Sequence, residues 1–304
     1  MRRRKPLRRQ AGRVPHPVNA MTIEAPAPAC EPEVVPRCAL HAVPRTLLVP
    51  LVARAWGAER YPWLACADRD ARRLLACVEP GARVLLDDAL VVLNVLWRTR
   101  VLKEAGQGFF ARHPQAAGAN LGCGLSNPFQ WLDTGRNTWL DADLPEVMAM
   151  RRALLPAHPP RRRQAEVDLR VPGWWSRLEL PPATAEVPVF VLCEGVLMYL
   201  RPREVQALLA EFGACAPAGS QLLADFISHL GVGCARALPS LAQERAQFRW
   251  GAQEWSDFTE PHPRLRLLAR HSAAQCYGWW ARLMEAGAEP LLGPALYGMA
   301  LLGV

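Results

Sequence analysis

The chain has 304 residues, of which 51% are hydrophobic, so it is long enough and apolar enough for a globular protein with a sizeable core. Its formal net charge is +8, but residues 1–20 hold seven Lys and Arg side chains and no acid, and without those seven the charge is only +1. A nearly neutral body excludes an extensive nucleic-acid-binding surface, so we expect no nucleic-acid partner.

The nine cysteines are scattered, with no C-x-x-C pair and no Cys/His spacing that suits zinc. We therefore expect no metal site and a reducing, cytoplasmic compartment. No apolar run reaches the ~18 residues of a membrane span, and the basic N-terminus lacks the apolar region of a secretory signal. No membrane association is expected.

Residues 1–42 are rich in Pro, basic at first and then mildly acidic, and we expect them to form a disordered tail. The tail is either an arm that touches an anionic partner or a dispensable segment. Residues 43–304 are expected to form a single domain, with a helical cap over 43–110 and an α/β core over 111–304.

Three segments of the cap carry apolar residues at helical spacing: 45–56, which we expect to be broken at Pro50, 68–78 and 87–102. Arg98 and Arg100 lie in the last of them, two residues apart, and so face different directions on a helix. At most one of the two is expected to point into a ligand site.

Strand and helix patterns alternate after the cap, which predicts a parallel sheet with helices on both faces. The run 188–193 is continuously apolar, as expected of a strand buried on both faces. Residues 228–262 are irregular, and we interpret them as a lid or acceptor wall. The predicted strands are 118–121, 137–144, 163–169, 188–193, 221–226, 289–292 and 296–303, and the predicted helices of the core are 145–156, 202–215 and 272–285.

A glycine turn and an acid point to a nucleoside-bearing cofactor. Gly122 and Gly124 let the backbone turn tightly after a strand, and Asp143, roughly twenty residues later, can accept the hydroxyl hydrogens of a ribose. A dinucleotide would require a third glycine, but that position is Asn127, followed by Pro128. S-adenosylmethionine (SAM) has no phosphate, so the pattern favours this cofactor.

Glu194 directly follows the apolar strand 188–193, at the carboxyl end where ligands of open α/β sheets bind. A buried carboxylate there needs a cation, and none adjoins it in sequence before Arg201. We expect its partner to be the α-ammonium group of SAM, which arrives only with the ligand.

The remaining candidate residues are weighed against ordinary structural roles. Asp141 is expected to be an exposed strand-end acid, and Cys123, which has no basic neighbour in sequence, is expected to pack rather than to attack a substrate. Tryptophan pairs at 174–175 and 279–280 are expected to pack in the core. The candidate general bases are His229, His262 and His271.

Four motifs give the chain a resemblance to a known family: Arg98-Thr99-Arg100, the segment NLGCGL over 120–125, DLPEV over 143–147 and EGVLMYL over 194–200. With these motifs the chain resembles the leucine carboxyl methyltransferase family, and within it the bacterial, polyketide-type (tetracenomycin-like) O-methyltransferases. The resemblance implies the class I SAM-dependent methyltransferase fold, which is α/β and Rossmann-like, with a mostly parallel seven-stranded sheet and a reversed last strand.

The resemblance also implies roles for particular residues. Arg98 would pair with the methionine carboxylate of SAM, Glu194 would accept from its α-ammonium group, and Asp143 would hold the ribose hydroxyls. Gly122 and Gly124 would pass beneath the amino-acid portion, Asp168 and Leu169 would flank the adenine, and Tyr199 would lie near the acceptor.

The chain departs from the family pattern at Ser126-Asn127-Pro128, where Asp-Thr/Ser-Arg is usual, and near Lys103, where an Asp is usual. The expected function is methyl transfer from SAM to a carboxylate or hydroxyl of a small, polyketide-like acceptor. A protein carboxyl methyltransferase and a non-catalytic SAM-binding relative are the alternatives. A carboxylate acceptor is already ionised, whereas a phenol, with a pKa near ~10, would gain from a general base.

Overall fold

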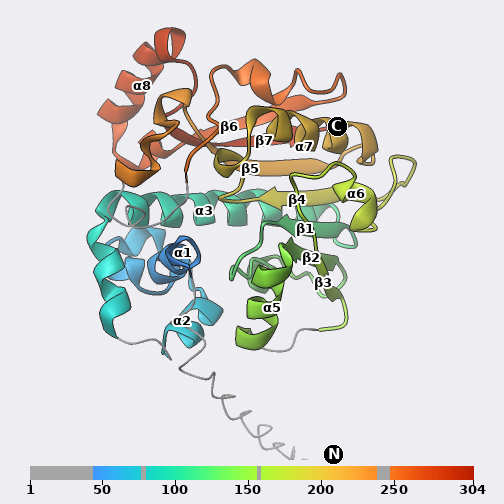
Figure 1. The fold of residues 1–304 in the computed structure, drawn as a ribbon, viewed down its shortest axis with the longest axis horizontal. Coiled ribbons are helices and arrows are strands. Elements are labelled where there is room, and N and C mark those ends of the chain that lie inside the picture. The colour runs from blue at the N-terminus through green and yellow to red at the C-terminus, as the bar shows by residue number, and fades with distance from the viewer. Residues whose placement is uncertain (1–43, 77–79, 156–158, 238–246) are drawn as a thin grey trace, which may run out of the picture. The chain divides into compact units, whose positions relative to one another are not determined.

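The computed structural model describes residues 44–76, 80–155, 159–237 and 247–304. They form a seven-stranded sheet in the order β3-β2-β1-β4-β5-β7-β6, with helices on both of its faces (Figure 1). The strands are β1 (Ala117–Leu121), β2 (Thr138–Asp143), β3 (Arg162–Glu166), β4 (Val189–Cys193), β5 (Gln221–Ile227), β6 (Arg266–Ser272) and β7 (Tyr297–Gly303). The helices are α1 (Arg45–Trp56), α2 (Arg69–Ala76), α3 (Ala89–Arg112), α4 (Phe129–Leu132), α5 (Pro145–Leu154), α6 (Trp174–Arg177), α7 (Pro202–Cys215) and α8 (Trp279–Leu292).

The strand directions confirm the predicted fold class. Strands β1 to β5 pair in parallel, whereas β7 runs antiparallel to both β5 and β6. Parallel neighbours need crossover connections, and α5 and α7 supply two of them. This strand order with a reversed β7 is the class I methyltransferase arrangement that the resemblance implied.

The central strand β4 shows how the sheet is buried on both faces. All five of its residues are buried, and successive side chains point to opposite faces. Val189, Val191 and Cys193 join the hydrophobic cluster that includes α6 and α7, while Phe190 and Leu192 join the one that includes α3. A third cluster joins α1 and α2 and contains Leu125, so the cap packs on the segment that follows β1.

Helix α3 continues ten residues beyond its predicted end and reaches Arg112. The extension contains Gly106 and Gly108, and at Gly106 the missing side chain allows close packing. A Cβ there would lie 2.8 Å from Leu132 Cδ2. Helix α1 likewise continues through Pro50.

The predicted order of the last elements was wrong. Residues 289–292, predicted as a strand, form the end of α8 and contain Pro290, and the predicted helix over 272–285 begins only at Trp279. Strand β6 was not predicted, because this edge strand is only partly buried and its side chains do not alternate cleanly between polar and apolar. Residues 1–42, predicted as a tail, lie outside the described residues.

Candidate functional site: a cavity at the carboxyl ends of the strands

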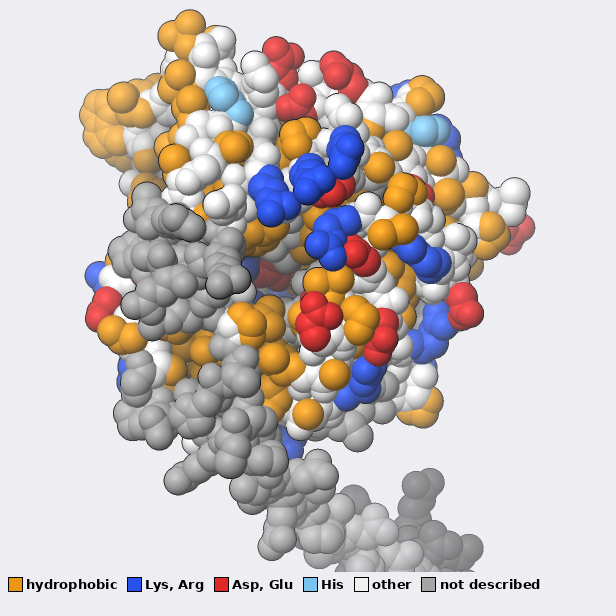
Figure 2. All heavy atoms as spheres, in the orientation of Figure 1, with side chains coloured by type: hydrophobic (Ala, Val, Ile, Leu, Met, Phe, Trp, Pro, Cys, Tyr) orange, Lys and Arg blue, Asp and Glu red, His pale blue; other side chains and the backbone are white. Residues whose placement is uncertain are grey.

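A cavity of about 1120 Å³ lies at the carboxyl ends of the central parallel strands. Its walls come from the loops after β1, β2, β3 and β4, from α1 and α3 of the cap, and from α8. All seven residues predicted to contact the cofactor line it, as does Tyr199. Figure 2 shows a hollow near the centre of one face of the molecule, with hydrophobic side chains at its rim and basic side chains beside it.

The turn after β1 has the strained backbone that only glycine adopts easily. Gly122 and Gly124 have φ values of +63° and +50°. A Cβ on Gly122 would lie 2.3 Å from Val196 Cγ2, and one on Gly124 would lie 2.9 Å from Leu47 Cδ2. The space beside the turn therefore exists only because these residues lack side chains. Between them Cys123 is buried, and burial raises the pKa of its thiol, so it packs as predicted.

Asp143 is the last residue of β2 and is tied to the glycine turn. Its Oδ2 accepts a hydrogen bond from Gly124 N at 2.8 Å, and its Oδ1 accepts one from Leu144 N at 2.8 Å. Burial raises the pKa of the carboxyl, and these backbone donors oppose the rise. Each oxygen has a second lone pair, so the carboxylate can accept further hydroxyl hydrogens from the cavity side.

Asp141 has a different role from Asp143, and the prediction that it is an exposed acid was wrong. Its side chain is fully buried, with Oδ2 2.6 Å from Arg162 Nε and 3.0 Å from Arg151 Nη2. Burial raises the pKa of Asp141, but the two arginines outweigh that effect and hold it below its usual value. Arg151 also donates to the carbonyl oxygens of Gly124 and Ser126, at 2.8 and 2.7 Å, so this ion-pair cluster supports the turn from beneath.

Asp168 and Leu169 line the cavity from the loop after β3, which ends at Glu166 rather than at the predicted Leu169. The Asp168 carboxylate accepts from Arg170 Nη2 at 2.7 Å and from Arg170 Nε at 2.8 Å. This pairing with Arg170 lowers the pKa of Asp168. Val167 N, one residue before Asp168, donates to Asp143 O at 2.8 Å, so this loop starts beside the end of β2. The contact of Asp168 and Leu169 with the adenine stays a prediction.

Glu194 is already paired with cations, contrary to the expectation that its partner comes with the ligand. Its Oε1 lies 2.6 Å from Arg98 Nε and 3.7 Å from Arg54 Nη1. The Arg98 contact is an ion pair without hydrogen-bond geometry, which leaves Glu194 Oε1 with no hydrogen bond from the described residues. Neither arginine is near Glu194 in sequence, because the folding of α1 and α3 over the sheet edge brings them there.

The side chains of Arg98 and Arg100 point in different directions, as predicted. Arg98 lines the cavity, whereas Arg100 is exposed and pairs with Glu104 at 2.8 Å. The Arg98 guanidinium has two further partners that the sequence analysis missed, Asp225 Oδ2 and Tyr297 Oη, each 3.0 Å from Nη1. Asp225 had a sequence signal, since it is the single charged residue of the apolar strand β5.

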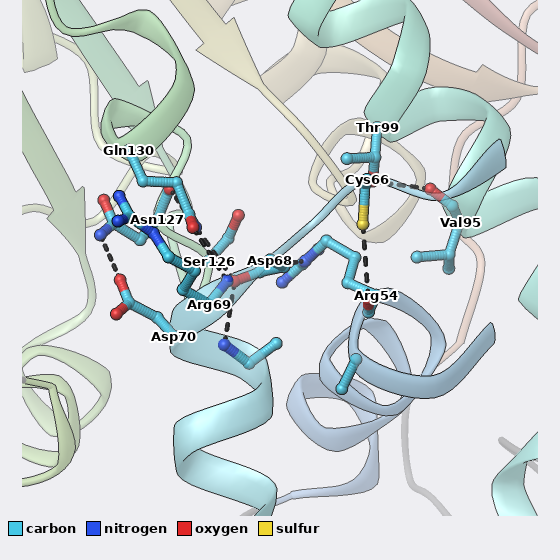
Figure 3. A network of polar contacts seen from close by, with 12 residues as sticks. Arg54, Cys66, Asp68, Arg69, Asp70, Val95, Thr99, Ser126, Asn127 and Gln130 are labelled. Carbon is cyan, nitrogen blue, oxygen red and sulfur yellow. Dashed lines mark hydrogen bonds and ion pairs between the residues drawn. The ribbon is translucent and has the colours of Figure 1, made fainter. Parts of the chain in front are cut away.

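The segment Ser126-Asn127-Pro128, which differs from the usual family pattern, joins the glycine turn to the cap (Figure 3). Asn127 Nδ2 donates to Asp70 Oδ2, and Gln130 Nε2 donates to Asp68 Oδ1 at 3.0 Å. The other oxygen of Asp68 accepts from Arg54 Nε at 2.9 Å. Figure 3 shows these side chains converging from α1, from the start of α2 with the residue before it, and from α4 with the loop before it. Because Arg54 also lies beside Glu194, the cap, the turn and the end of β4 form one connected network.

The acceptor side of the cavity is largely apolar. Tyr199, at the end of the 3₁₀ turn Leu197–Tyr199, packs its ring against Phe248 with centroids 5.5 Å apart. Tyr277 and the α8 residues Met284, Glu285 and Glu289 also line the cavity. Within 228–262, Gly231, Cys234 and Phe248 reach the cavity, and the interpretation of that segment as a lid stays a prediction.

The candidate bases and the second tryptophan pair lie outside the cavity lining, and the expectation that this pair packs in the core was wrong. None of the candidate bases His229, His262 and His271 lines the cavity, so none is placed to take a proton from an acceptor there. Trp279 and Trp280 do not pack in the core. They stack on one another with centroids 3.9 Å apart and are 63% and 61% exposed. Trp174 and Trp175 are buried as predicted.

The residues at the strand ends fit SAM. The glycine turn leaves room for a close ligand, Asp143 faces the cavity with unused acceptor capacity, and Glu194 Oε1 has no hydrogen bond from the described residues. The described residues contain no group of three or more His, Cys, Asp or Glu side chains placed to hold a metal ion. In the same part of the chain no helix combines the length and apolarity of a membrane span.

Comparison with known proteins agrees with the predicted cofactor class. The family model described as "Leucine carboxyl methyltransferase" matches residues 63–213. The chain is 28% identical over 234 residues to the tetracenomycin polyketide synthesis O-methyltransferase TcmP of Streptomyces glaucescens, covering 77% of this chain and 84% of that protein. It is 30% identical over 178 residues to the S-adenosyl-L-methionine-dependent methyltransferase dpfgK of Gibberella zeae, covering 54% and 58%.

Among solved structures, human N-acetylserotonin methyltransferase in complex with SAM is similar with a TM-score of 0.43, at 13% identity, over 82% of this chain and 66% of that one. The fold assignment therefore rests on the strand order described above. Together, the family match over residues 63–213, the curated relatives and the residues of the cavity identify this chain as a SAM-dependent methyltransferase that is similar to the leucine carboxyl methyltransferase family.

Proposed function

We propose that the enzyme transfers a methyl group to an oxygen, a carboxylate or a hydroxyl, of a small, polyketide-like acceptor. The observation that carries the proposal is the cavity itself. Its volume of about 1120 Å³ exceeds the ~300–1,000 Å³ of a typical ligand pocket, so it has room for an acceptor beside the cofactor. The similarity to TcmP, named for polyketide synthesis and O-methylation, supports the same acceptor class.

The cofactor contacts that we propose follow the strand ends. Gly122 and Gly124 would pass beneath the amino-acid portion, Asp143 would accept from the ribose, and Asp168 with Leu169 would flank the adenine. Arg98 would pair with the methionine carboxylate, and Glu194 Oε1 would accept from the α-ammonium group. When bound, SAM supplies the methyl group on a sulfonium.

The protein's part in the reaction is to position the acceptor oxygen and to exclude water. Met198, Tyr199 and Phe248 provide an apolar wall next to the cofactor end, which suits an aromatic acceptor. A carboxylate acceptor needs no base there. For a hydroxyl acceptor, the carboxylates that line the cavity on α8 are Glu285 and Glu289, and one of them would take the proton.

A product assay tests the proposal. The purified full-length enzyme is incubated with SAM and a matched panel: a polycyclic phenol, the corresponding carboxylic acid, and a peptide with a free C-terminus. We expect methylation of at least one small acceptor, with mild alkali cleaving a methyl ester but not a methyl ether. Methylation of the peptide alone would show a protein carboxyl methyltransferase instead.

A further inference from the structure

Asp225 is a carboxylate in one of the most apolar settings of the molecule. It is fully buried, and its strand neighbours Ala224 and Phe226 are fully buried too. A buried carboxylate is costly unless it is paired and its oxygens are hydrogen-bonded. Such a residue in the middle of a core strand therefore needs an explanation beyond packing, and its partners supply one.

Each partner of Asp225 belongs to the cofactor end of the cavity. Its Oδ2 lies 3.0 Å from Arg98 Nη1 and accepts from Tyr297 Oη at 2.7 Å. Its Oδ1 accepts from Gly195 N at 2.6 Å. Gly195 has a φ of +70° and directly follows Glu194, so this hydrogen bond holds the turn that carries Glu194. One carboxylate thus fixes both residues that face the methionine end.

Tyr297 completes the arrangement from the reversed strand β7. Its hydroxyl accepts from Arg98 Nη1 at 3.0 Å and donates to Asp225, so its donor and one acceptor position are both used. Burial raises the pKa of the phenol well above its usual value, and the hydroxyl stays neutral. The ring packs edge-on against Trp97, with centroids 5.9 Å apart, one residue from Arg98. The hydroxyl is therefore held in place independently of a ligand.

We propose that Asp225 and Tyr297 are positioning residues for the methionine end of SAM: they orient the Arg98 guanidinium and the Glu194–Gly195 turn before the cofactor arrives. The inference rests on the proposed contacts of Arg98 and Glu194 with the cofactor. Pre-organisation of this kind lowers the ordering cost of binding. It also makes the reversed strand β7 part of the cofactor site.

The test uses the full-length variants Asp225→Asn and Tyr297→Phe. Calorimetry measures their affinity for S-adenosylhomocysteine (SAH), and steady-state kinetics measures their KM for SAM and their kcat. We expect the dissociation constant to rise ~10- to 100-fold for Asp225→Asn, which loses a charged partner of Arg98, and about 5-fold for Tyr297→Phe. KM for SAM should rise with kcat much less changed. Because both substitutions act through Arg98, the rise in the dissociation constant of the double variant should be smaller than the product of the rises in the two single variants.

Two controls make the result decisive. Tyr61→Phe removes a half-buried hydroxyl that donates to Ala89 O at 3.3 Å outside the cavity, and it should leave SAH affinity unchanged. Asp143→Asn tests the proposed cofactor site separately.

If Asp143→Asn weakens SAH binding while Tyr297→Phe and Asp225→Asn lower only the melting temperature, the network is structural and this inference is overturned. If wild-type protein does not bind SAH, the proposed function fails first. Should Asp225→Asn not fold, Tyr297→Phe alone decides.

Discussion

The cavity wall is built differently at its two ends. At the strand ends it contains buried charged side chains such as Arg98 and strained glycines. Behind this wall Asp141 and Asp225 each have several partners within the protein. At α8 it consists mostly of apolar side chains together with Glu285 and Glu289, and no residue of this helix is buried. Met284 is 70% exposed, and Gly278 and Gly293 flank the helix at positive φ.

The difference indicates which end determines stability and which end can vary. A buried ion-pair network tolerates few changes, because removing one partner leaves another charge unpaired. An exposed apolar helix can change its side chains at little cost to folding. We infer that the cofactor end is held rigid for a constant ligand, whereas the α8 end is suited to adapt to the acceptor. Four experiments separate the two ends, and they are ordered by expected effect.

The largest effect is expected from Asp141→Asn, because it leaves Arg151 and Arg162 buried without their carboxylate. We expect a loss of about 3–5 kcal/mol in unfolding free energy near neutral pH. The folded-state pKa of Asp141 is lowered from 3.8, so its contribution is present above that value and is lost as pH falls through the folded-state pKa. The unfolding free energies of wild type and variant, measured by urea unfolding, should therefore become equal at acid pH. A constant difference at every pH would contradict this account.

Gly122→Ala should cost about 2–4 kcal/mol, since it combines a positive φ with a Cβ 2.3 Å from Val196 Cγ2. Gly135→Ala is the matched control, because its φ of +79° imposes similar backbone strain with nothing within 4 Å of the added Cβ. Calorimetry should show SAH affinity lost in the first variant and kept in the second. Equal destabilisation of both would mean that the contact with Val196 is unimportant.

Glu194→Gln should lower stability by roughly 1.5–3 kcal/mol even without ligand, because Arg98 and Arg54 lose a shared counter-charge. This reverses the sequence-based expectation of a Glu194 without a protein partner. SAH affinity should also fall, since Glu194 faces the cavity. Thermal unfolding with and without SAH measures both effects. An unchanged melting temperature of the free protein would show that the ion pair contributes nothing.

The smallest effect on folding is expected at α8. Met284→Ala and Leu291→Ala alter side chains that are 70% and 87% exposed, so each should change stability by less than about 0.5 kcal/mol. Only Met284 lines the cavity. We therefore expect a higher KM for the methyl acceptor in Met284→Ala and an unchanged one in Leu291→Ala. A large loss of stability in either variant would show that α8 belongs to the rigid part of the domain.

Several features of this protein could be predicted from local sequence. The apolar run of β4 and the amphipathic pattern of α7 predicted those elements nearly to the residue. Gly122, Gly124 and Asp143 could be selected as candidates because a tight turn after a strand and a carboxylate at the end of the next strand need particular residue types at a particular spacing. These signals depend on neighbours in sequence, which is why they could be read without a structure.

Other features depended on contacts between distant segments. The pairing of Glu194 with Arg98 and Arg54, and the attachment of Arg98 to Asp225 and Tyr297, join side chains far apart in the chain. Residues 289–292 read as a strand but complete α8, and β6 is defined mainly by its antiparallel partner β7. The sequence by itself determined the cofactor class and the central strands, because backbone conformation and periodicity are local properties. Only the tertiary structure decided which charges meet, because ion pairing depends on where the folded sheet and cap bring each side chain.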